Sequence, residues 1–313
     1  MSALNAMGLG LARLGLAALG GLPLPLLHRL AAGLAGWSRR VGSREARVAR
    51  VNLAVCFPEL DEDARERRLR EVLWHTACTV LECARIWTRP PVRSLDWVVE
   101  VEGMEHLEAA RAGGRGVIVA APHLGNWELF GHFLAACGPL TIVYRRPQWA
   151  PAESILLQGR GGAGVEQLPA QPSSVRGMLR ALAQGRLLGI LPDQQPKLGE
   201  GVFAPFLGRP ALTMTLLSRL AARSGAAVVF GFARRLPASR GFAVHFLPAP
   251  DGIDADDPVL AAAALNAGIE ACLARAPAQY QWTYKRFSRP PPGLTNPYLP
   301  PRPPPAPPPD PGS

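Results

Sequence analysis

The sequence has few cysteines, and their spacing narrows the possible classes of protein. Its five cysteines, Cys56, Cys78, Cys83, Cys137 and Cys272, are odd in number and scattered, without a C-x-x-C pair. This pattern argues against a disulfide framework or a zinc site and fits a reducing compartment. No serine stands in a G-x-S-x-G elbow either, so the nucleophile of the α/β-hydrolases is missing.

A long uninterrupted apolar run is also missing from the N-terminal part of the chain. Residues 3–36 are rich in Leu, Ala and Gly, but their longest uncharged stretch, Leu14–Leu27, has 14 residues. A regular bilayer span needs about 20 apolar residues. Nine arginines follow between Arg39 and Arg70, and such an excess is typical of a cytoplasmic flank. We therefore expect residues 1–38 to form a membrane anchor, interfacial or spanning once; a buried helix pair and a cleaved signal peptide are the alternatives.

Charge and length limit the partners and the number of domains. The 313 residues are 48% hydrophobic and carry a net charge of +10, almost all of it from arginine. This length predicts one large domain with appendages, which we place at 39–288. Such a basic chain suits an anionic membrane or a nucleic acid, but the basic residues lack interleaved aromatics and a recognisable module, which disfavours nucleic acid. From Arg289 onward 13 of 25 residues are proline, so 289–313 is predicted to be a disordered tail.

Short apolar runs alternate with helical patterns through the body of the chain. Strands are expected at 98–101, 116–121, 140–144, 187–191, 226–233 and 242–247, with helices between them and a last helix at 258–275. Alternation of this kind predicts an α/β layer fold with helices packed on a sheet.

The expected strand at 116–121 leads directly into polar residues. Pro122 ends the strand because it cannot donate to a ladder, and His123 follows. Asn126 is placed to cap a helix, with Glu128 in its first turn, where the helix dipole favours a carboxylate. Positions five apart on one helix lie roughly 140° from each other. His123 and Glu128 can therefore meet only if the histidine is on the loop, at the carboxyl end of a strand, where open α/β sheets place their sites.

A histidine beside a carboxylate predicts general-base chemistry. The carboxylate can hold the imidazole tautomer and stabilise the imidazolium. Because no serine or cysteine nucleophile is nearby in sequence, the base would activate a hydroxyl of the substrate, as in direct attack of an alcohol on a thioester. The alternative is a capping carboxylate and a loop histidine without a catalytic role.

Six ordered segments carry a resemblance to a known family. The segment Pro122–Glu128 resembles the catalytic motif of the bacterial lipid A late acyltransferases, which share a His-x-x-x-x-Asp/Glu motif with the wider glycerolipid acyltransferases. The other resembling segments are Arg50–Leu60, Val143–Arg145 with the later Arg160, Leu188–Gln194, Gly201–Pro210 and Pro277–Phe287. Together they cover the chain from about Arg50 to Phe287, nearly all of it except the ends.

The resemblance implies a glycerolipid-acyltransferase-like fold and an activity. The fold is a mixed central sheet with helices on both faces, plus N-terminal membrane-associated helices. The enzyme would transfer an acyl chain from acyl carrier protein (ACP) to a hydroxyl of a Kdo-bearing lipid A precursor, at the cytoplasmic face of the bacterial inner membrane. No cofactor or metal is implied, since acyl-ACP is a co-substrate.

Carried over by position, the resemblance makes His123 the general base and Glu128 its partner. Asp193 follows another expected strand, so it could face the same crevice, and Asn126 is included with the substrate-binding residues. The remaining candidates are arginines that suit the phosphates of a lipid A precursor, because guanidinium binds phosphate in a bidentate manner; they are Arg145, Arg146 and Arg160.

Some features leave alternatives open. Gly159–Gly164 satisfies G-x-G-x-x-G, but it follows an expected helix and no acid lies about 20 residues on, which disfavours a dinucleotide site. Thr283-Tyr284-Lys285 departs from the family's more usual basic pair. The acceptor could therefore be another glycolipid or a lysophospholipid, and a non-catalytic basic membrane-binding protein is the alternative from a different class.

Overall fold

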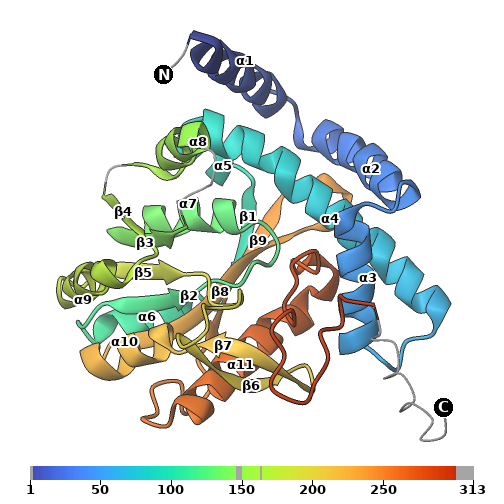
Figure 1. Cartoon of the computed structure of the whole chain (residues 1–313). Coiled ribbons are helices and arrows are strands. Elements are labelled where there is room, and N and C mark those ends of the chain that lie inside the picture. The colour runs from blue at the N-terminus through green and yellow to red at the C-terminus, as the bar shows by residue number, and fades with distance from the viewer. Residues whose placement is uncertain (1–2, 146–149, 163, 301–313) are drawn as a thin grey trace, which may run out of the picture.

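The centre of the molecule is a seven-stranded mixed sheet, seen in a computed structural model that describes residues 3–145, 150–162 and 164–300 (Figure 1). The strand order is β1-β9-β8-β2-β5-β3-β4, and only the β8–β9 pairing is antiparallel. A separate two-stranded sheet pairs β6 with β7. The strands are β1 (Val98–Glu102), β2 (Val117–Ala120), β3 (Leu140–Tyr144), β4 (Val165–Pro169), β5 (Leu187–Ile190), β6 (Gly201–Phe206), β7 (Arg209–Met214), β8 (Ala227–Arg235) and β9 (Phe242–Pro248).

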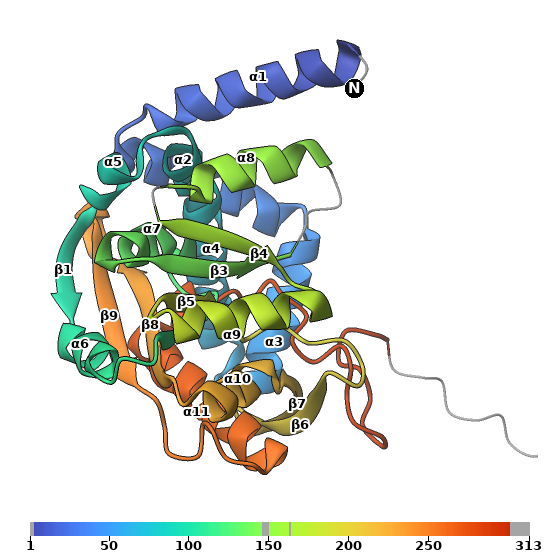
Figure 2. The same ribbon diagram turned by 90° about the vertical axis from the view of Figure 1, so that its left-hand side faces the viewer.

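Helices cover both faces of the large sheet (Figures 1 and 2). Alternate residues of β2 enter different apolar cores: Ile118 packs with residues of α9, α10 and α11, and Val119 packs with residues of α6 and α7. Side chains alternate between the faces of a strand, and helices cover both faces here. Strands β2 and β5 are therefore buried at every residue. The helices are α1 (Ala3–Gly20), α2 (Leu24–Arg40), α3 (Arg44–Cys56), α4 (Glu62–Thr88), α5 (Pro91–Leu95), α6 (Met104–Ala112), α7 (Trp127–Cys137), α8 (Ala150–Arg160), α9 (Val175–Ala183), α10 (Leu216–Ser224) and α11 (Pro258–Arg275).

The first two helices pack along α4, the longest helix among the described residues. One face of α2 is buried, and it includes Leu27 and His28, whereas Leu30 and Trp37 on the other side are exposed. The helical segments Arg13–Gly20 and Leu24–Arg40 meet at an angle of 119°. Only α11 is by itself long and apolar enough to cross a membrane within the described chain, and half of it is buried in the core.

The predicted α/β class, the mixed sheet and the helices on both faces are confirmed. Expected strands match β1, β2, β3, β5, β8 and β9 within one or two residues, and the expected helix at 258–275 matches α11. Three strands were not predicted: β4, β6 and β7. In the predicted tail, residues up to 300 turn back onto the body, where the Tyr298 hydroxyl contacts Asn52 at 2.5 Å. Disorder was therefore predicted too early, while residues 301–313 lie outside the described part.

Candidate active site

The register of two neighbouring strands brings His123 and Asp193 together. Strands β2 and β5 pair in parallel, and Ala120 lies opposite Ile190. His123 follows Ala120 by three residues, and Asp193 follows Ile190 by three, each directly after a proline. Because parallel strands end at the same edge of a sheet, both side chains emerge side by side at the carboxyl ends.

Asp193 holds His123 through two contacts. The ring Nδ1 of His123 lies 2.7 Å from Oδ1 of Asp193, and the backbone N–H of His123 donates to Oδ2 at 3.0 Å. The Asp193 side chain is 3% exposed and that of His123 is 13% exposed. Burial alone would raise the pKa of Asp193, but the charge of His123 and these hydrogen bonds outweigh it and lower that pKa. An ionised Asp193 needs a proton on Nδ1 of His123, which leaves Nε2 as the acceptor.

Among the described residues, the second nitrogen of the imidazole has one long hydrogen bond. Nε2 of His123 lies 3.3 Å from the side-chain nitrogen of Gln194, which in turn lies 3.3 Å from Oε1 of Gln281. Trp127 packs edge-on to the imidazole, with ring centroids 5.0 Å apart. A neutral histidine held in this tautomer can accept a proton from a hydroxyl placed at Nε2.

Glu128 has different partners. Its carboxylate accepts hydrogen bonds from Nε of Arg160 at 2.8 Å and from Nε1 of Trp87 at 3.1 Å, and Nη2 of Arg160 contacts its second oxygen. Burial alone would raise the pKa of Glu128, but the hydrogen bonds and charge of Arg160 outweigh it and lower that pKa. Arg160 closes a bidentate ion pair, the strong form of charge-assisted hydrogen bonding.

The expected contact between His123 and Glu128 therefore needs a correction. Among the interactions of the described residues none joins the two side chains, and Asp193 takes the position at Nδ1 that was expected for Glu128. The reason is the direction of the first turn of α7, which aims Glu128 at α4 and α8, where Trp87 and Arg160 lie. Arg160, expected on a substrate phosphate, uses two of its nitrogens on this protein carboxylate.

Asn126 caps α7 as predicted, and its Oδ1 accepts from the backbone N–H of Leu129 at 3.0 Å. Its Nδ2 donates to Oε2 of Glu82 at 2.9 Å, and the residue is fully buried. Both ends of this amide are thus bonded inside the protein, and its expected contact with substrate stays a prediction. Arg145 is exposed directly after β3, and Arg146 lies outside the described residues.

Sequence reasoning missed the residues that surround the pair. Gln194 and Gln281 carry no chemical signature of their own, and Trp127 reads as an ordinary helix residue. The direct partnership of His123 and Asp193 did carry a signal: two apolar strands, each followed by proline and then by the polar residue at an equal offset. Only the pairing of those strands was needed to use it.

The fold and this geometry define a class of protein: an α/β protein with a histidine held by a buried aspartate at the carboxyl ends of its strands, and with no serine or cysteine of the described chain bonded to that histidine. The family model for bacterial lipid A biosynthesis acyltransferases matches residues 2–289. The chain belongs to this family, and it is an acyltransferase.

Several relatives show the range of the family. The lipid A biosynthesis lauroyltransferase of Escherichia coli is 31% identical over 88% of this chain and 90% of its own length. The palmitoleoyltransferase of the same organism is 30% identical over 89% and 90%, and its myristoyltransferase is 26% identical over 91% and 89%. The identities to relatives named for three different acyl groups lie within a few per cent of one another, and family membership supports acyl transfer in lipid A biosynthesis.

Proposed function

We propose that this enzyme transfers a fatty acyl chain from acyl-ACP to a hydroxyl of a Kdo-bearing lipid A precursor, with His123 as the general base. The observation that carries the proposal is the 2.7 Å contact between Nδ1 of His123 and the buried carboxylate of Asp193. It leaves Nε2 to receive the hydroxyl proton. The family supplies the lipid A context, and the donor is inferred from the sequence resemblance.

The proposed step needs no covalent enzyme intermediate. The acceptor hydroxyl gives its proton to Nε2 of His123 while its oxygen attacks the thioester carbonyl. The tetrahedral intermediate then expels the thiolate, the carbon–sulfur bond breaks, and the imidazolium returns its proton to the leaving sulfur. Asp193 stabilises the imidazolium between these steps. The products are a lipid ester and the free thiol of ACP.

Glu128 and Arg160 have a second role in the proposal. Their ion pair lies between α7 and α8 and involves Trp87 of α4. Since Glu128 shares the seven-residue motif with His123, the ion pair fixes the start of α7 directly after residues 123–126, which we call the catalytic loop. We propose that it keeps this wall of the site rigid, with Arg145 as the exposed cation available to a substrate phosphate.

The N-terminal helices are proposed to hold the enzyme on the cytoplasmic face of the inner membrane. One face of α2 exposes apolar side chains at helical spacing: Leu26, Leu30, Leu34 and Trp37. Arg29, Arg39 and Arg40 lie on the same helix, and arginine near an anionic leaflet adds attraction. The 119° angle between the two helical segments suits an interfacial helix better than a single straight span. An apolar face of this kind lies in the interface plane.

Incubation of the purified enzyme with a series of acyl-ACPs and a Kdo-lipid A precursor in detergent micelles tests the reaction. We expect mass spectrometry to show one added acyl chain and release of free ACP thiol. Transfer only to a lysophospholipid or another glycolipid would contradict the proposed acceptor. Activity with acyl-coenzyme A but with no acyl-ACP would contradict the donor.

A further inference from the structure

A buried charged network lies beneath the catalytic loop and is centred on Glu82. Glu82 is fully buried on α4, and Nε of Arg235 donates to its Oε1 at 2.6 Å while Nη2 contacts Oε2. Nε2 of His28 lies 2.7 Å from Oε1, and Nδ2 of Asn126 donates to Oε2 at 2.9 Å. Three side chains, from α2, β8 and the cap of α7, therefore share this one carboxylate of α4.

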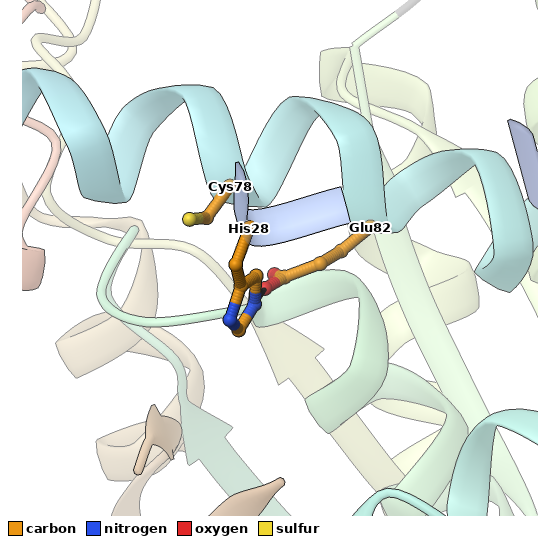
Figure 3. Close-up of side chains that lie close together, drawn as sticks. All are labelled: His28, Cys78 and Glu82. Carbon is orange, nitrogen blue, oxygen red and sulfur yellow. Dashed lines mark hydrogen bonds and ion pairs between the residues drawn. The ribbon is translucent and has the colours of Figure 1, made fainter. Parts of the chain in front are cut away.

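Three of the nearby side chains could suggest a metal site. The ligand atoms of His28, Cys78 and Glu82 lie within 4.8 Å of one another, and Figure 3 shows His28 and Glu82 reaching toward each other from α2 and α4. The guanidinium of Arg235 already neutralises Glu82, however, so a cation would have to displace a buried positive charge. Burial also raises the pKa of the Cys78 thiol to about 12, and zinc takes the thiolate form. The cluster is better explained by what it holds in place.

The network reaches the backbone of the catalytic loop through Thr79. The Thr79 hydroxyl lies 3.0 Å from the carbonyl oxygen of Gly125, to which it donates, and it accepts from Nη2 of Arg235 at 3.0 Å. Arg235 also acts through its backbone, because its N–H donates to the side chain of Gln279 at 2.8 Å. The carbonyl of Gln279 accepts the N–H of Gly125 at 3.1 Å. The backbone N–H and C=O of Gly125 are thus each hydrogen-bonded to a residue that Arg235 also contacts, Gln279 and Thr79.

The loop also approaches strand β8 very closely. The N–H of Asn126 donates to the carbonyl of Ala233 at 2.9 Å, and a Cβ at Gly125 would stand 1.9 Å from that same oxygen. Gly125 has φ +65°, a conformation that glycine adopts without steric cost. With so little room, a small shift of β8 or α4 would move His123, two residues away.

We propose that Glu82 and Arg235 are positioning residues for acyl transfer, which hold residues 123–126 so that the imidazole meets the acceptor hydroxyl. The inference rests on the proposed function. Burying an ion pair is costly, and well-packed apolar residues often replace one without loss of stability. Besides its contacts with His28 and His75, the pair bonds to Asn126 and Thr79, which both connect to residues 125–126. Stability alone therefore does not account for these links to the loop.

A double variant separates positioning from stability. Glu82→Met/Arg235→Met removes both buried charges, while Leu69→Ala is the control, since Leu69 is a fully buried α4 residue of the apolar core. The double variant should keep a Tm close to that of the parent and lose about tenfold to a hundredfold in kcat, because small misplacements of reacting groups cost that much. KM should not change. Leu69→Ala should lower Tm and leave kcat unchanged.

Hydrogen exchange of the folded protein gives a second measurement that needs no substrate. We expect the amides of residues 123–126 to exchange at least about tenfold faster in the double variant than in the parent, with amides of β5 unchanged. Asn126→Ser keeps a capping oxygen but cannot reach Glu82. Its loop amides should exchange as fast as those of the double variant, and its kcat should fall equally. If the double variant does not fold, Asn126→Ser alone tests whether the network positions the loop. Parental kcat and parental loop exchange in these variants would overturn the proposal. If the parent itself transfers no acyl chain, the proposed reaction is wrong, and the exchange data still decide whether the network positions the loop.

Discussion

Two buried carboxylates of one site differ in the partner that each holds. Asp193 is paired with His123, whose imidazole keeps Nε2 to accept a proton, whereas Glu128 is paired with Arg160, whose guanidinium can only donate. Both carboxyl groups have lowered pKa values for comparable reasons. The difference therefore lies in the basic partner: the pair of Asp193 and His123 can move a proton, whereas the pair of Glu128 and Arg160 acts only through its position.

The largest expected effect comes from removing the base. His123→Ala should lower kcat by about 10³-fold, within the range that a positioned acid–base group contributes. Far-ultraviolet circular dichroism should show an unchanged fold, because His123 lies on a loop. Undiminished transfer by a folded His123→Ala variant would contradict the mechanism and remove the reason for distinguishing the two pairs.

The next effect tests the partner of the histidine. Asp193→Asn keeps the size of the side chain but loses the charge that stabilises the imidazolium, so kcat should fall by about 10²-fold. The pH profile of kcat should shift as well, since the base has lost its anion. A stability loss with an unchanged pH profile would show that Asp193 acts only through packing.

A smaller effect on rate and a clear effect on stability are expected at the other pair. Glu128→Gln should cost about 3 kcal/mol in the free energy of unfolding, because a broken buried ion pair leaves an uncompensated charge. This is the lower end of the usual range, since the Arg160 side chain is 24% exposed. Urea titration measures the loss. Arg160→Gln is the matched variant, and equal rate losses in the two would show that they act as a unit. A rate loss in Glu128→Gln as large as in His123→Ala would instead return Glu128 to direct partnership with His123.

The smallest effect concerns pH and does not separate the two carboxylates. Because the pKa values of Glu128 and Asp193 are lowered, both carboxylates stabilise the folded state above about pH 4.5, and this stabilisation is lost as the pH falls further. Burial and the charge of Arg235 lower the pKa of His75 from 6.5 to about 3. The neutral His75 therefore contributes fully to the free energy of unfolding above pH 6.5, and this contribution is lost on acidification toward pH 3. Unfolding titrations should show a loss of about 1–2 kcal/mol between pH 6.5 and 4.5 and a steeper loss below. His75→Gln should remove the first part; a flat curve in the parent would contradict it.

Much of the fold was predictable because its strands are short apolar runs bounded by turn residues. Leu140–Tyr144 and Pro258–Arg275 match their predicted limits, and Asn126 caps α7 as its residue type suggested. Strand β4 was missed because Val165–Pro169 contains Glu, Gln and Pro and is only half-buried at the sheet edge. The hairpin of β6 and β7 was missed because Pro205 and Pro210 interrupt the alternation.

The membership of the site was predictable in part, and the partner of Glu128 was not. Local spacing showed that His123 and Glu128 lie on either side of a helix start, but it could not show where the first turn of α7 points. That direction depends on Trp87 and Arg160, which are 41 and 32 residues from Glu128 in sequence. The loop supports at Glu82 and Arg235 are 153 residues apart, and a buried charge pair of that separation leaves no pattern in a single sequence.

His123 and Asp193 each follow a paired residue of β2 and β5 by three positions, so the sheet sets the distance between the two side chains. This distance follows from the separation of neighbouring strands, about 4.8 Å. The two short segments from the strand ends to His123 and Asp193 need only have equal length. Substitutions inside the strands that preserve volume should leave that spacing intact, whereas one residue added to either connection would separate the imidazole from its carboxylate. An insertion in either short segment should therefore disrupt the pair even though both of its side chains are kept.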